Sequence, residues 1–152
     1  MAILDLDTGA LVKLYVRETG TDELLRLAHP DAGNRLAVLS LSRIEFRAAL
    51  RRRAKLGDID GPVADELLKS FSDHISSVFQ IQPANEAVVE KAAGLVDRYV
   101  LRAYDSLQLA GCSVLKATVG DTIDVRFVCA DATLLAAARA EGFATIDPIS
   151  IY

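Results

Sequence analysis

The sequence predicts an α/β fold built on a parallel sheet, and three observations support this. Short apolar segments that fit buried strands alternate along the chain with longer amphipathic segments that fit helices. This alternation is typical of right-handed crossover units, which place helices on both faces of a parallel sheet. The 152 residues contain no internal repeat, low-complexity tract or linker. We therefore expect a single domain over residues 1–152, with three α/β/α layers and a short central sheet of four or five strands.

The elements can be assigned in order along the chain. Apolar segments predict strands at residues 2–6, 36–40, 77–81, 125–129 and 143–146. Amphipathic segments predict helices at about residues 8–16, 21–29, 42–56, 63–76, 85–99, 101–120 and 131–140. Thr8 and Ser42 fit helix N-caps, because a hydroxyl at that position accepts a hydrogen bond from a free backbone N–H group. The segment from Gly57 to Pro62 predicts a turn that separates two of these helices.

Composition limits the class of protein. Hydrophobic residues make up 51% and charged residues 25% of the chain, as in a globular protein. A net charge of -4 argues against nucleic-acid binding by bulk charge but leaves room for a local basic patch. No apolar run reaches the roughly 20 residues of a membrane span, and the start does not resemble a secretory leader, so we expect a cytoplasmic protein. Two cysteines are too few for a disulfide framework.

The segment 101–110 contains a single carboxylate, Asp105, in a largely apolar helix. Leu101, Asp105, Gln108 and Leu109 share one helix face through their three- and four-residue spacing. A carboxylate among apolar neighbours is costly to bury unless it is paired or holds a cation. The alternative is that Asp105 is an ordinary first-turn acid, which the helix dipole favours.

Three further carboxylates are expected near the same edge of the sheet. Asp7 ends the first strand, Glu45 lies one turn into the helix after the second strand, and Asp131 follows the strand that ends at Cys129. Ligands of open α/β sheets bind beyond the carboxyl ends of the strands. Converging carboxylates repel one another, and a hard divalent ion such as Mg²⁺ or Mn²⁺ relieves this repulsion. The pattern predicts metal-assisted phosphoryl chemistry.

Each of these acids also has a purely structural explanation. Asp7 and Asp131 fit helix N-caps, and Glu45 fits an exposed acid that pairs with Arg43 or Arg47. Taken singly, the two explanations are equally good; the joint placement favours a site. Neither histidine lies near these segments, which disfavours zinc and triad chemistry.

Four segments give the chain a clear resemblance to PIN-domain ribonucleases of the VapC toxin type. They occur in the family's order at residues 6–13, 42–45, 101–110 and 127–138, the last followed by Gly142. The resemblance implies a PIN-like fold, metal ligation by Asp7, Asp105 and Asp131, and Glu45 as the remaining catalytic acid. It also implies Mg²⁺-dependent (or Mn²⁺-dependent) endonucleolytic cleavage of RNA, a homodimer, and inhibition by a small VapB-like antitoxin.

Two positions depart from the family's pattern. Gly9 stands where Ser or Asn is usual, and Cys129 stands where Thr or Ser is usual. Both family residues are polar near the metal, so their loss weakens the hydrogen bonds that orient ligands, while Thr8 remains to help. These departures leave open a non-catalytic PIN-like module that binds RNA or a partner.

A less favoured alternative is a haloacid-dehalogenase-like phosphatase. Asp5 and Asp7 partly match its motif, in which the first Asp is a nucleophile and the second an acid/base. Gly9 and the position of the later acids do not fit that motif, and it leaves Asp105 and Glu45 without a role.

Basic residues crowd the helix predicted after residue 42. Such runs are commonly solvated helix faces. The functional hypothesis is that Lys13, Arg47 and Arg51 flank the acids and hold RNA phosphates. Cleavage in loops would suit such a protein, because RNA sequence is read mainly in single strands.

Overall fold

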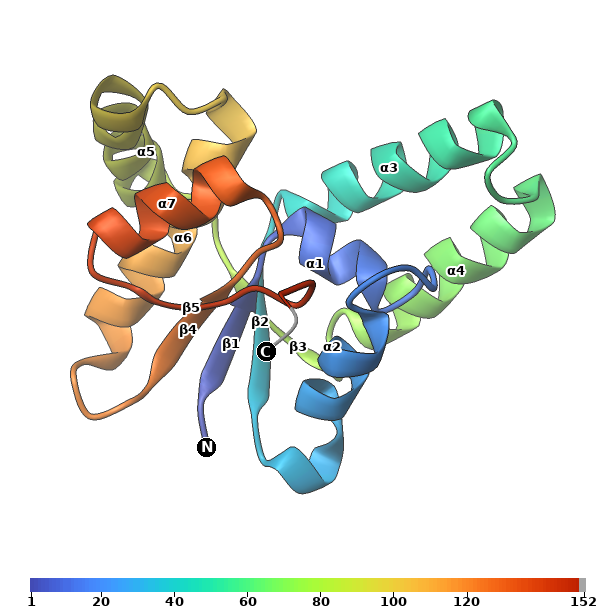
Figure 1. Cartoon of the computed structure of the whole chain (residues 1–152), viewed down its shortest axis with the longest axis horizontal. Coiled ribbons are helices and arrows are strands. Elements are labelled where there is room, and N and C mark those ends of the chain that lie inside the picture. Colours follow the sequence, from blue (N-terminus) through green and yellow to red (C-terminus); the bar gives the residue numbers. More distant parts are fainter. Residues whose placement is uncertain (151–152) are drawn as a thin grey trace.

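The computed structural model describes residues 1–150, so residues 151–152 of the predicted domain lie outside the described part. A five-stranded, all-parallel sheet runs through the molecule in the order β3-β2-β1-β4-β5 (Figure 1). The strands are β1 (Ile3–Leu6), β2 (Arg35–Leu39), β3 (Phe79–Gln82), β4 (Val125–Val128) and β5 (Ala144–Ile146). The predicted α/β class with a parallel sheet of four or five strands is confirmed.

Helices cover both faces of the sheet, as predicted. They are α1 (Thr8–Lys13), α2 (Thr21–Ala28), α3 (Ser42–Leu56), α4 (Gly61–His74), α5 (Glu86–Tyr99), α6 (Ala103–Val119) and α7 (Ala132–Ala140), with a 3-10 turn η1 at Pro30–Ala32. Helices α5, α6 and α7 lie on one face, and α1 to α4 lie on the other (Figure 1). Helices α3 and α4 pack on each other as a hairpin that extends beyond the sheet.

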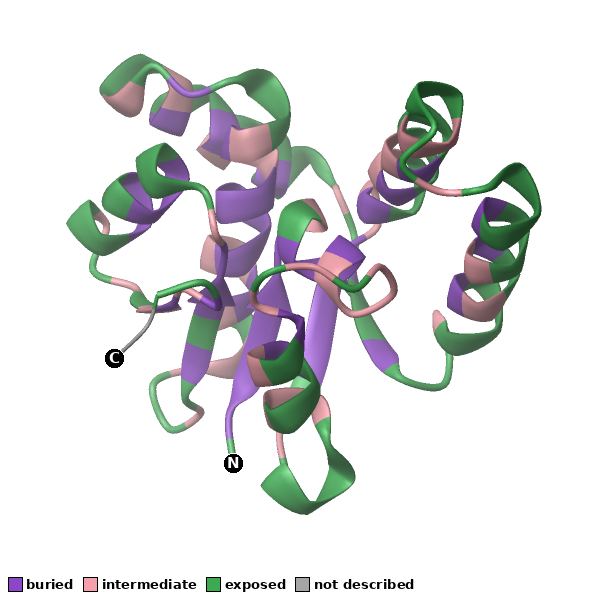
Figure 2. Ribbon diagram, turned by 45° about the vertical axis from the view of Figure 1, so that its right-hand side comes forward, coloured by how far each residue is buried: buried purple, intermediate pink, exposed green. Residues whose placement is uncertain are grey.

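Alternation along the strands builds two hydrophobic cores, one on each face. Within β1, Ile3 packs among residues of α5 to α7, whereas Leu4 and Leu6 pack among residues of α1 to α4. All four residues of β1 are buried, as expected for a strand covered on both faces (Figure 2). This central position of β1 fixes the residue that follows it, Asp7, at the carboxyl edge of the sheet.

Two predicted N-caps are wrong. The N-cap of α1 is Asp7 and not Thr8, because the Asp7 Oδ1 atom accepts the Ala10 N–H at 2.8 Å. The N-cap of α3 is Leu41, without a side-chain bond, and the Ser42 hydroxyl instead accepts a hydrogen bond from Gln108. In both cases a tertiary contact takes the hydroxyl that the local pattern assigned to a helix end.

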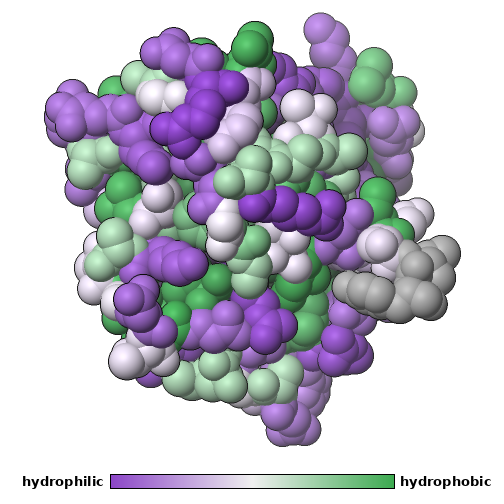
Figure 3. Space-filling view, turned by 60° about the vertical axis from the view of Figure 1, so that its left-hand side comes forward, coloured by the Kyte–Doolittle hydropathy of each residue, from purple (hydrophilic) through white to green (hydrophobic). Residues whose placement is uncertain are grey.

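The outer surface over α5, α6 and α7 has hydrophilic and hydrophobic residues closely interspersed (Figure 3). Within residues 1–150, no helix combines the length and the apolar character that crossing a membrane requires.

Candidate active site

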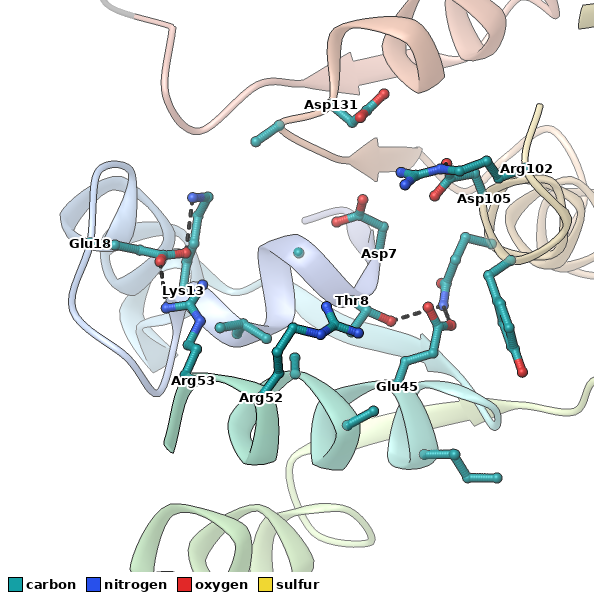
Figure 4. Close-up of a pocket in the computed structure, with 18 residues that line it drawn as sticks. Asp7, Thr8, Lys13, Glu18, Glu45, Arg52, Arg53, Arg102, Asp105 and Asp131 are labelled. Carbon is teal, nitrogen blue, oxygen red and sulfur yellow. Dashed lines mark hydrogen bonds and ion pairs between the residues drawn. The ribbon is translucent and has the colours of Figure 1, made fainter. Parts of the chain in front are cut away.

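A pocket of about 630 Å³ opens at the carboxyl edge of the sheet, and all four predicted acids line it. Asp7 follows β1, Glu45 lies in the first turn of α3, Asp105 in the first turn of α6, and Asp131 caps α7. Figure 4 shows these four side chains around one end of the pocket, although they come from distant parts of the chain. The structure therefore brings the four acids to one pocket, and their joint role in holding a metal stays a prediction.

Asp7 is the most buried of the four acids, with 7% of its surface exposed. The pKa of Asp7 is raised to about 6, mainly by burial and also by the charges of Asp105 and Glu45, while hydrogen bonds from Ala10 and Cys129 partly offset the rise. A nearby cation would stabilise the charged form of a carboxyl whose pKa is raised in this way.

Glu45 is held by a buried amide. The Gln108 Nε2 atom lies 2.8 Å from Glu45 Oε1 and 3.1 Å from the hydroxyl oxygens of both Thr8 and Ser42. Partial burial raises the pKa of Glu45, as does the charge of Asp105, while bonds from Gln108 and Thr8 lower it. Gln108 thus ties α6 to α1 and α3 and fixes the position of Glu45.

Asp105 and Asp131 are held by different contacts. The Arg102 Nε atom donates to Asp105 Oδ2 at 2.9 Å, and the hydrogen bond with Asp105 and the charges of Asp105 and Asp131 raise the pKa of Arg102. Asp131 Oδ1 accepts the Leu134 N–H at 2.8 Å as the cap of α7. Both acids leave a second carboxylate oxygen that these bonds do not use.

The two positions that depart from the family's pattern lie beside Asp7. The Cys129 Sγ atom accepts the Asp131 N–H at 3.3 Å and also hydrogen-bonds Asp7, so a polar link between these acids persists. A Cβ atom added at Gly9 would lie 3.6 Å from Asp7 Oδ1, an ordinary contact distance. The structure therefore has room for a side chain at position 9, and Gly9 leaves that space open.

Asp5 does not reach the pocket. It is 3% exposed in the middle of β1, and it hydrogen-bonds Cys112 of α6 inside the core. The pKa of Asp5 is raised to about 8, mainly by burial and also by the charge of Asp7, while the hydrogen bond with Cys112 lowers it. A nucleophile must meet its substrate, so this placement does not fit the phosphatase alternative. Asp5 is instead enclosed between β1 and α6, away from solvent.

The other end of the pocket is basic. Lys13 Nζ lies 3.1 Å from Glu18 Oε1, and Arg53 Nη1 lies 2.8 Å from Glu18 Oε2. Burial raises the pKa of Glu18, but the bonds from Arg53 and Lys13 outweigh it and leave that pKa below its ordinary value. Arg52 lies between this cluster and the acids (Figure 4).

The structure places the three predicted RNA-binding residues differently from one another. Lys13 lines the pocket, as expected. Arg51 points away from it and pairs with Asp65 of α4 at 2.7 Å, and Arg47 lines a separate groove between α3 and α4. The expectation that Arg47 and Arg51 flank the acids is not met, because α3 turns those positions away from β1.

The donor set suits a hard divalent ion, since carboxylate oxygens are the ligands that Mg²⁺ and Mn²⁺ prefer. Within residues 1–150, however, no three His, Cys, Asp or Glu side chains are arranged to hold one ion. Asp7 and Asp131 each bond a helix N-terminus, and Asp105 faces Arg102. For Asp7, Asp105 and Asp131 to hold one ion together, Asp105 would have to give up its ion pair with Arg102.

Three further residues line this pocket to which the sequence assigned no role in the site: Gln108, Arg52 and Arg102. Gln108 lies three residues after Asp105, so helical spacing placed it near the acid but gave no sign of its partners. Arg52 lies seven residues, or two turns, after Glu45 on α3. That spacing places Arg52 on the same helix face as Glu45, and it could have distinguished Arg52 from its basic neighbours.

Comparisons with solved structures show the same architecture. FitAcB from Neisseria gonorrhoeae is 15% identical with a TM-score of 0.68, covering 97% of this chain and 99% of that one. A toxin–antitoxin complex from Klebsiella pneumoniae is 14% identical with a TM-score of 0.66, covering 99% and 100%. VapC20 from Mycobacterium tuberculosis, a sarcin–ricin loop cleaving toxin, is 16% identical with a TM-score of 0.65, covering 95% and 99%. At such identities these likenesses establish the fold alone.

Sequence comparison identifies the family directly. No curated protein matches the chain significantly. The family described as PIN domain matches residues 6–131, which include all four acids of the pocket and most of the chain. The chain belongs to the PIN domain family.

Proposed function

We propose that this protein is a metal-dependent endoribonuclease toxin of the VapC type, which cleaves RNA phosphodiester bonds at the acidic end of the pocket. One observation carries the proposal: Asp7, Glu45, Asp105 and Asp131, from four separate segments, line one open pocket. PIN domains are generally nucleases, and the similar structures include a toxin that cleaves the sarcin–ricin loop.

Each acid has a proposed role. Asp7, Asp105 and Asp131 would hold Mg²⁺ or Mn²⁺, which when bound supplies an activated water and charge stabilisation at the phosphate. Gln108 keeps Glu45 oriented toward the pocket. The raised pKa of Glu45 suits a general base, which accepts a proton from water. Thr8 supports this arrangement by sharing the Gln108 amide.

The proposed partners follow from the same likenesses. Solved structures of similar fold include toxin–antitoxin complexes, which supports a cognate VapB-like antitoxin that inhibits this chain. We also propose a homodimer in the cytoplasm. Sedimentation velocity tests the dimer, and a monomer at micromolar concentration would contradict that part of the proposal.

The test is cleavage of a random-sequence pool of single-stranded RNA with Mg²⁺, with Mn²⁺ and with EDTA. We expect the wild type to cleave only with metal. Asp7→Asn and Asp105→Asn should each lower the rate by a factor of roughly 100 or more, because each removes a charged ligand. Folding of each variant is checked by circular dichroism. Equal rates for all three proteins would refute catalysis by this site.

A non-catalytic PIN-like module is the second candidate. Gly9 beside Asp7 and the absence, within residues 1–150, of three side chains arranged around one ion favour it. Under this alternative the wild type binds the RNA pool but leaves it intact at every metal concentration. The cleavage assay above therefore separates the two candidates.

A further inference from the structure

Arg52 is the one pocket-lining cation of α3 without a partner among the described residues. Neither a hydrogen bond nor an ion pair joins Arg52 to any residue of the 1–150 range. Its neighbour Arg51 pairs with Asp65, and Arg53 pairs with Glu18. An unpaired guanidinium beside a substrate pocket is available to an anionic ligand.

Glu18 explains why Arg52 alone is available. Each oxygen of the Glu18 carboxylate already has a cation, Lys13 on Oε1 and Arg53 on Oε2. The charges of Lys13 and Arg53 are therefore largely offset inside the protein, while the charge of Arg52 is not. Of the three cations at this end of the pocket, Arg52 offers the strongest attraction to a phosphate.

The position of Arg52 relative to the acids is set by α3. Arg52 follows Glu45 by two helical turns, which is about 10 Å along the axis. Helix side chains lean toward the N-terminus, so the guanidinium extends back toward the acids, as Figure 4 shows. The small side chains of Ala48 and Ala49 line the pocket between the two positions. The floor between Glu45 and Arg52 is therefore open to a nucleic-acid backbone.

We infer that Arg52 forms a phosphate-binding subsite that holds single-stranded RNA one position away from the phosphate at the acids. The inference rests on the proposed nuclease function and adds to it the path of the substrate backbone along α3. A guanidinium suits this role because its parallel N–H groups match the oxygens of a phosphate. Arg52 binds and positions the substrate and takes no part in the proton transfers.

The test compares Arg52→Ala with Arg51→Ala, which makes the same change in charge at the preceding residue of the same helix. Apparent KM and kcat are measured on the random-sequence single-stranded RNA pool, and binding is measured by anisotropy over a range of salt concentrations. For Arg52→Ala we expect the apparent KM to rise roughly tenfold with little change in kcat. The slope of log affinity against log salt should fall by about 0.7. Arg51→Ala should resemble the wild type, and Arg52→Lys should recover part of the affinity.

The outcomes separate this inference from the proposed function. A wild type that cleaves RNA, with Arg52→Ala and Arg51→Ala equally affected or equally unaffected, overturns the Arg52 subsite and leaves the nuclease proposal intact. A wild type that neither binds nor cleaves the pool contradicts both. Thermal unfolding of each variant is measured beside the binding. A loss of affinity in Arg52→Ala that Arg52→Lys does not relieve, at unchanged stability, also contradicts a role based on charge.

Discussion

The positively charged side chain of Arg102 lies among the acids of the pocket, where a metal ion would otherwise offset their charge. It donates to Asp105 and lies close enough to Asp131 for the charge of that carboxylate to raise the pKa of Arg102. Since Arg102 is mostly exposed, the ion pair is weak and can be exchanged. The side chain would therefore compete with the proposed divalent ion for Asp105 without blocking the site.

Removal of Arg102 should strengthen metal binding. We expect Arg102→Ala to lower the Kd for Mn²⁺ by roughly two- to fivefold, because it removes an exposed cation that pairs with Asp105. Isothermal titration calorimetry measures the Kd without reference to catalysis. Arg98→Ala is the matched control, because Arg98 pairs with Glu141 outside the pocket. Unchanged or weaker Mn²⁺ binding in Arg102→Ala would show that Arg102 does not compete for the site.

At the scale of elements, α3 carries both Glu45 and Arg52, so its anchoring determines the shape of the pocket. The anchor is Phe46, which is fully buried and packs against Phe71 with ring centroids 4.4 Å apart and against Tyr15 at 5.2 Å. The residues of α3 on either side of this buried stripe are largely charged and exposed. Apolar packing along a single stripe therefore holds a mostly polar helix against the sheet.

Truncation of this anchor should be costly. We expect Phe46→Ala to lower the free energy of unfolding by about 3 to 5 kcal/mol, because it leaves a cavity between α1, α3 and α4. Denaturant unfolding measures the change. Ile44→Ala, two residues earlier at a position 66% exposed, should shift it by less than about 0.5 kcal/mol. Similar losses in both variants would mean that α3 is not held by the Phe46 stripe.

At the scale of the whole molecule, a carboxyl buried in the core links stability to pH. The folded protein holds the proton of Asp5 up to a pKa of about 8, whereas the unfolded chain releases it near 3.8. Between these values the folded state binds more protons than the unfolded state, so the free energy of unfolding falls as pH rises. Asp7, with its pKa of about 6, adds to this fall only in the lower part of the window.

Asp5→Asn should flatten this dependence, because asparagine is neutral at every pH and has the shape of a protonated carboxyl. Between pH 6.5 and 8, where Asp7 contributes little, we expect the wild type to lose about 1 kcal/mol per pH unit more than the variant. Urea unfolding at several pH values in this range, with EDTA present, gives the two slopes. Parallel slopes would mean that Asp5 is already ionised in the folded protein at neutral pH.

Much of the fold could be predicted because its signals are local. Strand β1 has a continuous apolar pattern broken only by Asp5, and Asp131 caps its helix as the sequence predicts. Errors arose where a side chain with a local use had a distant partner. Ser42 is the clearest case, because its hydroxyl meets Gln108, 66 residues away.

The sequence by itself determined the α/β class, the alternation of elements and the four acids of the pocket, because periodicity and strand-end position are properties of neighbouring residues. Only the tertiary structure decided which cations face those acids. Arg51, Arg52 and Arg53 are consecutive and alike in sequence, yet they meet Asp65, the open pocket and Glu18 respectively. The reason is geometric: successive residues of a helix point about 100° apart, and what each one meets depends on how the helix packs against the rest of the chain.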